Sequence, residues 1–242
     1  MNMFTDTVKA RRRGRPPGQT AQGAAARERL YGTAIQLIAK RGYEATTLRD
    51  IAQAAGVSVG LLYRYFPSKQ AVVLALYDDL SAEQSAHAAA LPRGRWRERF
   101  LFTLETSLTI LGPHRQTLTA LIPVLLSNAP DGLFSGTTAF SRERVQRVYQ
   151  DAVVGASDAP RAEVAAALGR LLYLAHLGVV LWWLLDKSPQ QRATRALVKL
   201  VTSALPAAAM TLRLPKVGAF ILAGDRLFQE ALIGEPQPGA SA

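Results

Sequence analysis

Apolar residues recur at helical spacing along most of the chain, and no stretch alternates as a strand does. Near the start, Leu30, Ala34, Leu37 and Ile38 form one stripe, and Gly42 follows where a helix would end. This pattern predicts an amphipathic helix that packs its apolar side on a core.

Two shorter helices are predicted next. Thr47 and Asp50 have the spacing of a capping box, Gly56 ends the second helix, and Ser58 caps the third. The apolar stripe of the second helix comprises Leu48, Ile51, Ala52 and Ala55. Two short helices joined by a glycine turn are typical of a helix-turn-helix, whose second helix enters the DNA major groove. Any two amphipathic helices joined by glycine would share the pattern.

The chain beyond Ser68 reads as longer helices separated by Pro and Gly. The predicted ranges are 68–90, 93–111, 113–128, 134–156, 160–186 and 189–212, with a further helix after Pro215. Pro123 is expected to kink its helix. The predicted fold class is therefore all-α, with an N-terminal three-helix domain before a larger helical domain. We expect a disordered basic arm over 1–23, a DNA-binding domain over 24–70, a ligand-binding and dimerisation domain over 71–214, and an extra helix with a tail over 215–242.

Positive charge is concentrated at the N-terminal end. Residues 1–70 contain 12 Lys and Arg against four acids, so they carry +8 of the net charge of +11. A basic end on a nearly balanced body indicates a module that binds a polyanion. A membrane surface would also attract it, but the folded recognition unit favours DNA.

The segment from Arg41 to Lys69, RGYEATTLRDIAQAAGVSVGLLYRYFPSK, resembles the DNA-binding domain of the tetracycline-repressor (TetR) family. The resemblance covers about a quarter of the chain. It includes the Gly42-Tyr43 pair, the Gly56-Val57-Ser58 turn and the Tyr65-Phe66 pair.

The resemblance implies a set of DNA contacts. Hydroxyl, Tyr and Lys side chains would bind phosphates, the start of the third helix would face the groove, and Arg49 would read a base, for which guanine is suited. The expected DNA-binding residues are Thr46, Thr47, Arg49, Ser58, Val59, Gly60, Leu61, Tyr63, Arg64, Tyr65 and Lys69. Val59 departs from the family, where this position is often polar, so base reading would depend more on Arg49 and Arg64.

The basic arm contains a second candidate DNA contact. Arg13-Gly14-Arg15-Pro16 resembles the core of an AT-hook, in which Arg13 and Arg15 would enter a narrow minor groove. The alternative is a nonspecific basic tail that binds by counterion release.

A ligand cavity is expected in the helices between 93 and 156, where sparse polar groups accompany apolar ones. The candidate lining residues are Phe100, Thr103, Leu104, Ser107, His114, Leu121, Ile122, Leu125 and Tyr149. In the resembled family, a small-molecule effector bound in this domain moves the fourth helix and separates the DNA-reading heads. An ordinary core without a ligand is the alternative.

The apolar run from Leu171 to Leu185 has 15 residues, shorter than a membrane span of about 20. It is therefore predicted to be a buried or dimer-forming helix. The last two long helices match the dimer interface of the resembled family, with candidates Leu174, Leu177, Trp182, Trp183, Val198, Val201 and Leu205. A homodimer would suit a palindromic double-stranded DNA operator.

Catalytic chemistry is weakly supported. The chain has no Cys, its three His are dispersed, and phosphate-binding loops are absent. We therefore expect no enzyme, no catalytic residue, no metal site and no cofactor. The expected function is a cytoplasmic, ligand-responsive transcriptional regulator, most readily a repressor. A nonspecific architectural DNA-binding protein and an all-helical enzyme are the alternatives.

Overall fold

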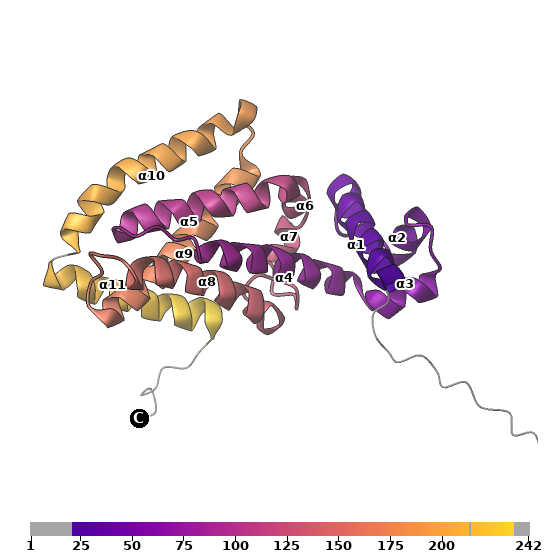
Figure 1. Cartoon of the computed structure of the whole chain (residues 1–242), viewed down its shortest axis with the longest axis horizontal. Coiled ribbons are helices and arrows are strands. Elements are labelled where there is room, and N and C mark those ends of the chain that lie inside the picture. The colour runs from indigo at the N-terminus through magenta and orange to yellow at the C-terminus, as the bar shows by residue number, and fades with distance from the viewer. Residues whose placement is uncertain (1–20, 213, 235–242) are drawn as a thin grey trace, which may run out of the picture.

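The computed structural model describes residues 21–212 and 214–234, and over these residues the chain is all helical, as predicted (Figure 1). The elements in chain order are α1 Ala21–Arg41, α2 Leu48–Ala54, α3 Val59–Tyr65, α4 Lys69–Ala88, α5 Trp96–Leu111, η1 Gly112–His114, α6 Arg115–Ala120, α7 Ile122–Leu125, η2 Gly136–Thr138, α8 Ala139–Val154, α9 Ala162–Leu185, η3 Pro189–Gln191, α10 Arg192–Thr211, α11 Pro215–Phe228 and η4 Gln229–Ile233.

Helix boundaries differ from the prediction in three places. α1 begins at Ala21, so its first three residues overlap the arm expected over 1–23. The single helix predicted over 113–128 is divided into η1, α6 and α7, with a break at Leu121. Pro123 lies in the first turn of α7, where its missing N–H costs nothing. α8 begins at Ala139 because residues 136–138 form a tighter 3-10 turn.

The N-terminal domain comprises α1, α2 and α3, which lie together at one end of the molecule (Figure 1). Leu30, Ile38, Ile51 and Leu62 are fully or almost fully buried between these helices. The same core continues through the first half of α4 and reaches α6. α4 is therefore packed into both domains.

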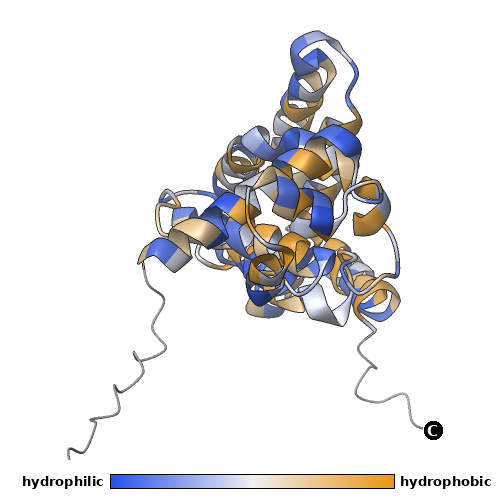
Figure 2. Ribbon diagram, turned by 90° about the vertical axis from the view of Figure 1, so that its right-hand side faces the viewer, coloured by the Kyte–Doolittle hydropathy of each residue, from blue (hydrophilic) through white to orange (hydrophobic). Residues whose placement is uncertain are grey.

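The second domain is a bundle centred on α8 and α9, covered by α4, α5 and α11. Figure 2, in which the end that holds α1 to α3 faces the viewer, shows hydrophobic and hydrophilic stretches alternating along the helices. α10 runs along the outer edge of the bundle (Figure 1), and its Leu200 and Met210 are 65% and 75% exposed. The predicted further helix after residue 214 is present as α11.

α9 is longer than the apolar run that it contains. The helix is 24 residues long, because it continues for nine residues before the apolar run that starts at Leu171. By length and composition it would suffice to cross a membrane, so the length argument against a span is wrong. Its packing is that of a core helix, since Leu172, Tyr173 and Trp183 are buried against the rest of the bundle.

Candidate nucleic-acid interface and internal cavity

The start of α2 is held by the predicted capping box. The Thr47 hydroxyl accepts from the backbone N–H of Asp50 at 3.1 Å, and a carboxylate oxygen of Asp50 accepts from the Thr47 N–H at 2.9 Å. Hydrogen bonds to the carboxylate lower the pKa of Asp50. Gly56 occupies the left-handed region at φ +65°, and the Ser58 hydroxyl accepts from the N–H of Leu61. Local polar side chains therefore set the angle between α2 and α3.

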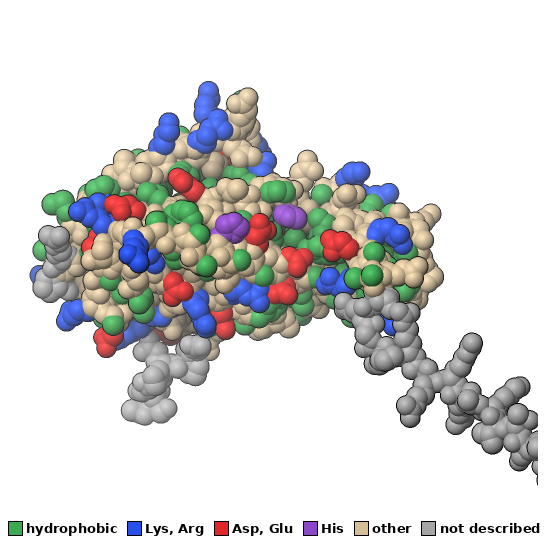
Figure 3. Space-filling model, in the orientation of Figure 1, with side chains coloured by type: hydrophobic (Ala, Val, Ile, Leu, Met, Phe, Trp, Pro, Cys, Tyr) green, Lys and Arg blue, Asp and Glu red, His purple; other side chains and the backbone are tan. Residues whose placement is uncertain are grey.

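The outward side of α3 is available for a partner. Val59 and Tyr63 are 37% and 51% exposed, and Gly60 and Arg64 are exposed. Arg49 is exposed on α2. Figure 3 shows Lys and Arg side chains on this end of the face in view. The predicted groove-facing residues thus share an accessible surface, whereas Arg13 and Arg15 lie outside the described residues.

Two of the predicted phosphate contacts are already engaged within the chain. Thr46 is fully buried and its hydroxyl donates to the Gly42 carbonyl at 2.8 Å, so its predicted phosphate contact is wrong. Lys69 is half-buried, and its ammonium donates to the Tyr43 carbonyl at 2.6 Å and lies 4.2 Å from the centre of the Tyr43 ring. This contact joins the start of α4 to the loop before α2.

Tyr43 also connects the two domains. Its hydroxyl donates to a carboxylate oxygen of Asp131 at 2.8 Å, and Tyr77 of α4 donates to the Asp131 carbonyl oxygen at 3.3 Å. Burial and the neighbouring carboxylate raise the pKa of Tyr43, so the phenol remains a donor. Asp131 itself is only 6% exposed. The loop between α7 and η2 is thus tied to the N-terminal domain by a link that sequence reasoning missed.

The second domain contains a cavity of about 510 Å³, in the range of small-molecule sites. Hydrocarbon side chains from α4, α5, α6, α7, α8 and α9 line most of it. The polar or ionisable side chains of the lining are Tyr77, Ser81, Gln84, Ser107, Ser141, Arg142, Tyr173 and His176. A cavity is therefore present in this domain. The prediction placed it in the helices between 93 and 156, but α4 and α9 also contribute to its lining.

Three of the nine predicted lining residues line this cavity, namely Ser107, Ile122 and Leu125. The other six were assigned wrongly: Phe100, Thr103, Leu104, Leu121 and Tyr149 are buried in the cores, and His114 is half-buried in η1. Their helices were predicted, but which side of a helix faces a void depends on how distant helices pack. Tyr77, Gln84 and Arg142 were missed for the same reason.

His176 lies in the cavity wall as a neutral group. Its Nε2 lies 2.7 Å from the Ser107 hydroxyl, and its ring stacks on Tyr149 with centroids 4.8 Å apart. Complete burial lowers the pKa of His176 to about 3. At neutral pH it therefore offers hydrogen bonding without charge.

The predicted dimer residues divide into two groups. Leu174 and Leu177 line the cavity, while Trp183 and Leu205 are 4% and 8% exposed, so these four already pack within one chain. Trp183 is held by its indole N–H, which donates to Gln191. Val198 and Val201 are half-buried, and Trp182 is 51% exposed. These three retain surface for a partner.

The fold and the exposed helix pair define a helix-turn-helix DNA-binding protein with a helical second domain that holds a cavity. Residues 30–76 match the family model described as bacterial regulatory proteins, tetR family. The matched segment is therefore a tetR-type DNA-binding domain, as its sequence predicted. Residues beyond 76 lie outside that match.

A curated relative shows the same restriction to the N-terminal domain. The chain is 46% identical over 59 residues to the HTH-type transcriptional repressor KstR2 of Rhodococcus jostii, which is 24% of this chain and 29% of that protein. The chain thus aligns with less than a third of this relative's length. The likeness supports the DNA-binding domain and leaves the second domain untested.

Solved structures extend the likeness to the whole fold. A putative TetR-family transcriptional regulator from Syntrophomonas wolfei superposes with a TM-score of 0.63 at 15% identity, covering 80% of this chain and all of that one. FadR from Bacillus subtilis, solved in complex with stearoyl-CoA, gives a TM-score of 0.57 at 14% identity, covering 73% and 97%. At these identities the likeness shows the fold.

Proposed function

We propose that the chain is a ligand-responsive DNA-binding transcriptional regulator that acts as a homodimer in the cytoplasm and represses genes near a palindromic operator. The observation that carries the proposal is one chain with an exposed recognition helix at one end and a cavity in the other domain. α4 spans the two, from Lys69 beside the helix-turn-helix to Gln84 in the cavity wall.

The surface of α3 supports DNA as the partner. Its first turn presents Val59, Gly60 and Leu61, which permit close approach to base edges and thymine methyl groups. Tyr63 and Arg64 lie further along and suit phosphate or base contacts. Because a recognition helix reads only a few base pairs, two copies about one helical turn apart would read a palindrome.

Dimerisation is supported by the apolar surface that α9 and α10 leave exposed. Trp182, Leu185 and Leu200 are 51%, 55% and 65% exposed. Large exposed aromatic and aliphatic side chains on neighbouring helices favour a subunit interface.

Coupling between the cavity and the DNA surface has two routes. Tyr77, Leu80, Ser81 and Gln84 of α4 line the cavity, so a ligand that displaces them displaces the helix that begins at Lys69. The second route is the loop between α7 and η2, whose Leu133 and Phe134 line the cavity while its Asp131 accepts from Tyr43. A ligand that binds one arrangement of these elements better than the other would shift operator affinity.

The cavity supports binding more than catalysis. Its lining is mostly hydrocarbon, and its one histidine is held neutral by burial. FadR from Bacillus subtilis, which shares the fold, was solved in complex with stearoyl-CoA. These features support a small-molecule effector and a role without chemistry.

Selection of bound duplexes from a random library with the purified chain tests the proposal. We expect an enriched inverted repeat whose half-sites are about 10 base pairs apart. Tyr63→Ala should weaken binding to the enriched duplex, because a phosphate contact of α3 is lost. A library that shows no enrichment while bulk DNA still binds would instead support a nonspecific architectural protein.

A further inference from the structure

Three buried polar side-chain atoms lack a hydrogen-bond partner among the described residues: Arg142 Nε, Tyr149 Oη and His176 Nδ1. All three belong to the second domain, and Arg142 and His176 line the cavity. Unsatisfied buried polar groups are costly, since each has lost its water without gaining a partner. Two of the three, Arg142 and His176, belong to the lining of one cavity, which points to a bound molecule as their partner.

Arg142 is the most costly of the three because it is charged. It is 6% exposed on α8, and its Nη1 donates to the carbonyl oxygens of Leu133 and Ser135 at 3.3 and 3.1 Å. Among residues 21–212 and 214–234, no carboxylate lies within 4.0 Å of its guanidinium. A buried guanidinium is costly when it has neither a counter-anion nor an acceptor for each of its nitrogens, and Arg142 Nε has neither.

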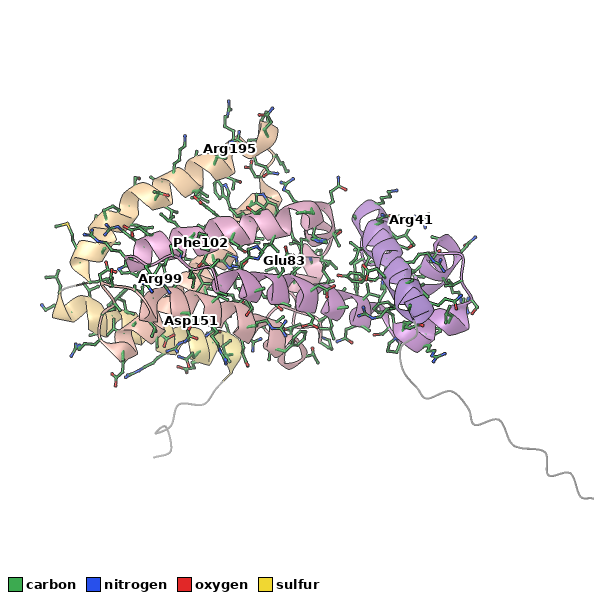
Figure 4. All side chains as sticks on the ribbon, in the orientation of Figure 1. Arg41, Glu83, Arg99, Phe102, Asp151 and Arg195 are labelled. Carbon is green, nitrogen blue, oxygen red and sulfur yellow. The ribbon has the colours of Figure 1, made fainter. Side chains whose placement is uncertain are left out.

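Two other arginines of the same domain have hydrogen-bond partners on their Nε side. Arg99 is also buried, and its three nitrogens donate to the carbonyl oxygens of Pro92, Asp151 and Ala152; Arg99 and Asp151 lie together in Figure 4. Arg170 places Nε and Nη2 2.7 and 2.5 Å from the two carboxylate oxygens of Asp225. Arg142 lacks what Arg170 has, which is a carboxylate along its Nε and Nη2 edge.

The rest of the cavity defines the remainder of the ligand. Leu, Ile and Val side chains from six helices make up most of its wall, and Arg142 is the one permanently charged residue among those that line it. Ser107 and His176 add a neutral hydrogen-bonding pair. The site therefore combines a hydrocarbon chamber with a single cationic point.

We propose that the cavity binds a mainly hydrocarbon molecule ending in a carboxylate, with Arg142 as the anchor for that carboxylate. This inference rests on the proposed ligand-responsive function and specifies its effector class. The carboxylate supplies the counter-anion that the described part of the chain does not, and the chamber takes the apolar body.

The anchor also connects the ligand to the DNA-binding domain. The guanidinium group that meets the carboxylate donates to the Leu133 and Ser135 carbonyls, which lie in the segment that follows Asp131. Asp131 accepts from Tyr43 of the N-terminal domain. A carboxylate that draws Arg142 towards the cavity therefore loosens or shifts the loop that fixes Tyr43.

Calorimetric titration of the purified full-length chain without DNA tests the anchor, using octanoate and 1-octanol as matched probes. We expect octanoate to bind at least about tenfold more tightly than octanol, as charge-assisted hydrogen bonds require. Affinity should rise about fourfold per added methylene from hexanoate to decanoate until the chamber is filled. Equal affinities for octanoate and octanol, or no binding of either, would overturn the proposal.

Variants assign the preference to the residue. Arg142→Gln should bring the octanoate-to-octanol affinity ratio close to one and leave octanol affinity within about twofold. Arg147→Gln, an exposed arginine of the same helix, should keep the wild-type ratio. Arg142→Lys retains the charge without the bidentate edge and should keep an intermediate ratio, which serves as the readout if Arg142→Gln does not fold. An unchanged ratio in either Arg142 variant contradicts the anchor.

The same probes separate this inference from the proposed function. If octanoate binds through Arg142 but leaves operator affinity unchanged, the anchor stands and ligand-controlled DNA binding fails. If an unrelated ligand releases the operator while octanoate and octanol bind equally, the regulator stands and the carboxylate assignment fails.

Discussion

The two domains differ in how their polar side chains are satisfied. In the helix-turn-helix, the hydroxyls of Thr46, Thr47 and Ser58 are engaged with backbone or side-chain atoms within four residues. In the second domain, Arg142 and His176 keep buried nitrogens without a partner beside the cavity. The helix starts of the first domain are satisfied by nearby residues, and its recognition helix faces outwards. The second domain has buried nitrogens at its cavity that the described residues leave without a partner.

The largest expected effect is a loss of stability in the N-terminal domain. Leu62 is fully buried in the N-terminal core, so Leu62→Ala should destabilise the chain by about 2–5 kcal/mol. Hydrogen exchange should show protection lost first in α1 to α3. Leu227→Ala, at a 66% exposed position of α11, is the control and should change stability by no more than about 0.5 kcal/mol. Uniform loss of protection across α8 and α9 would deny the difference between the domains.

A pH effect is expected from the second domain. The pKa of His176 is lowered from 6.5 to about 3 in the folded chain, so the unfolded state binds a proton in this window and the folded state does not. Stability should therefore fall as the pH drops from about 6.5 towards 3, by about 1.4 kcal/mol per pH unit at most. Urea unfolding of wild type and His176→Gln across this range measures the contribution of His176. The free energy of unfolding should change less steeply with pH in the variant. Parallel slopes would contradict the assignment.

The link between the domains should give a smaller change in stability. Tyr43→Phe removes the donor to the buried Asp131 carboxylate and should cost about 1–3 kcal/mol. It should also weaken the response of operator binding to an effector, while basal operator affinity changes less. Fluorescence anisotropy with and without effector measures both quantities. A full response in Tyr43→Phe would mean that α4 alone carries the coupling.

The smallest expected effect concerns base recognition by the N-terminal domain. Arg49→Ala should lower operator affinity by about 1–3 kcal/mol and relax the preference at one base position. Arg195→Ala is the matched control, because this arginine lies on α10, far from α2 (Figure 4). Sequence selection with each variant gives the readout. Equal losses on operator and random DNA would mean that Arg49 contacts phosphate only.

What the sequence predicted follows the same division. The caps, the glycine turn and the stripes of α1 to α3 depend on residues within a few positions of one another, so their pattern predicted them. Asp131 and Tyr43 are 88 residues apart and meet through the packing of two domains. Ser107 and His176 are 69 residues apart in the sequence and likewise meet only through the packing of their helices. No local pattern distinguishes Arg142, which faces the cavity, from Arg147, which faces outwards, until α8 is packed.

Thr46 shows the limit of reasoning by resemblance. Its hydroxyl was expected at the DNA surface, and the structure places it inside, bonded to Gly42. The two neighbouring threonines lie in different environments. Thr46 is buried, whereas Thr47 is exposed and caps α2. Tyr63 and Arg64 kept the exposed positions that the pattern predicted.

The central claim is that the DNA surface and the cavity are coupled through α4 and the Asp131 loop. Coupling is reciprocal, so binding of operator must alter the cavity side even without an effector. Hydrogen exchange of the chain with and without a selected operator duplex measures this directly. We predict changed protection in α4 and in residues 126–135 as well as in α2 and α3. Changes confined to residues 21–66 would contradict the coupling.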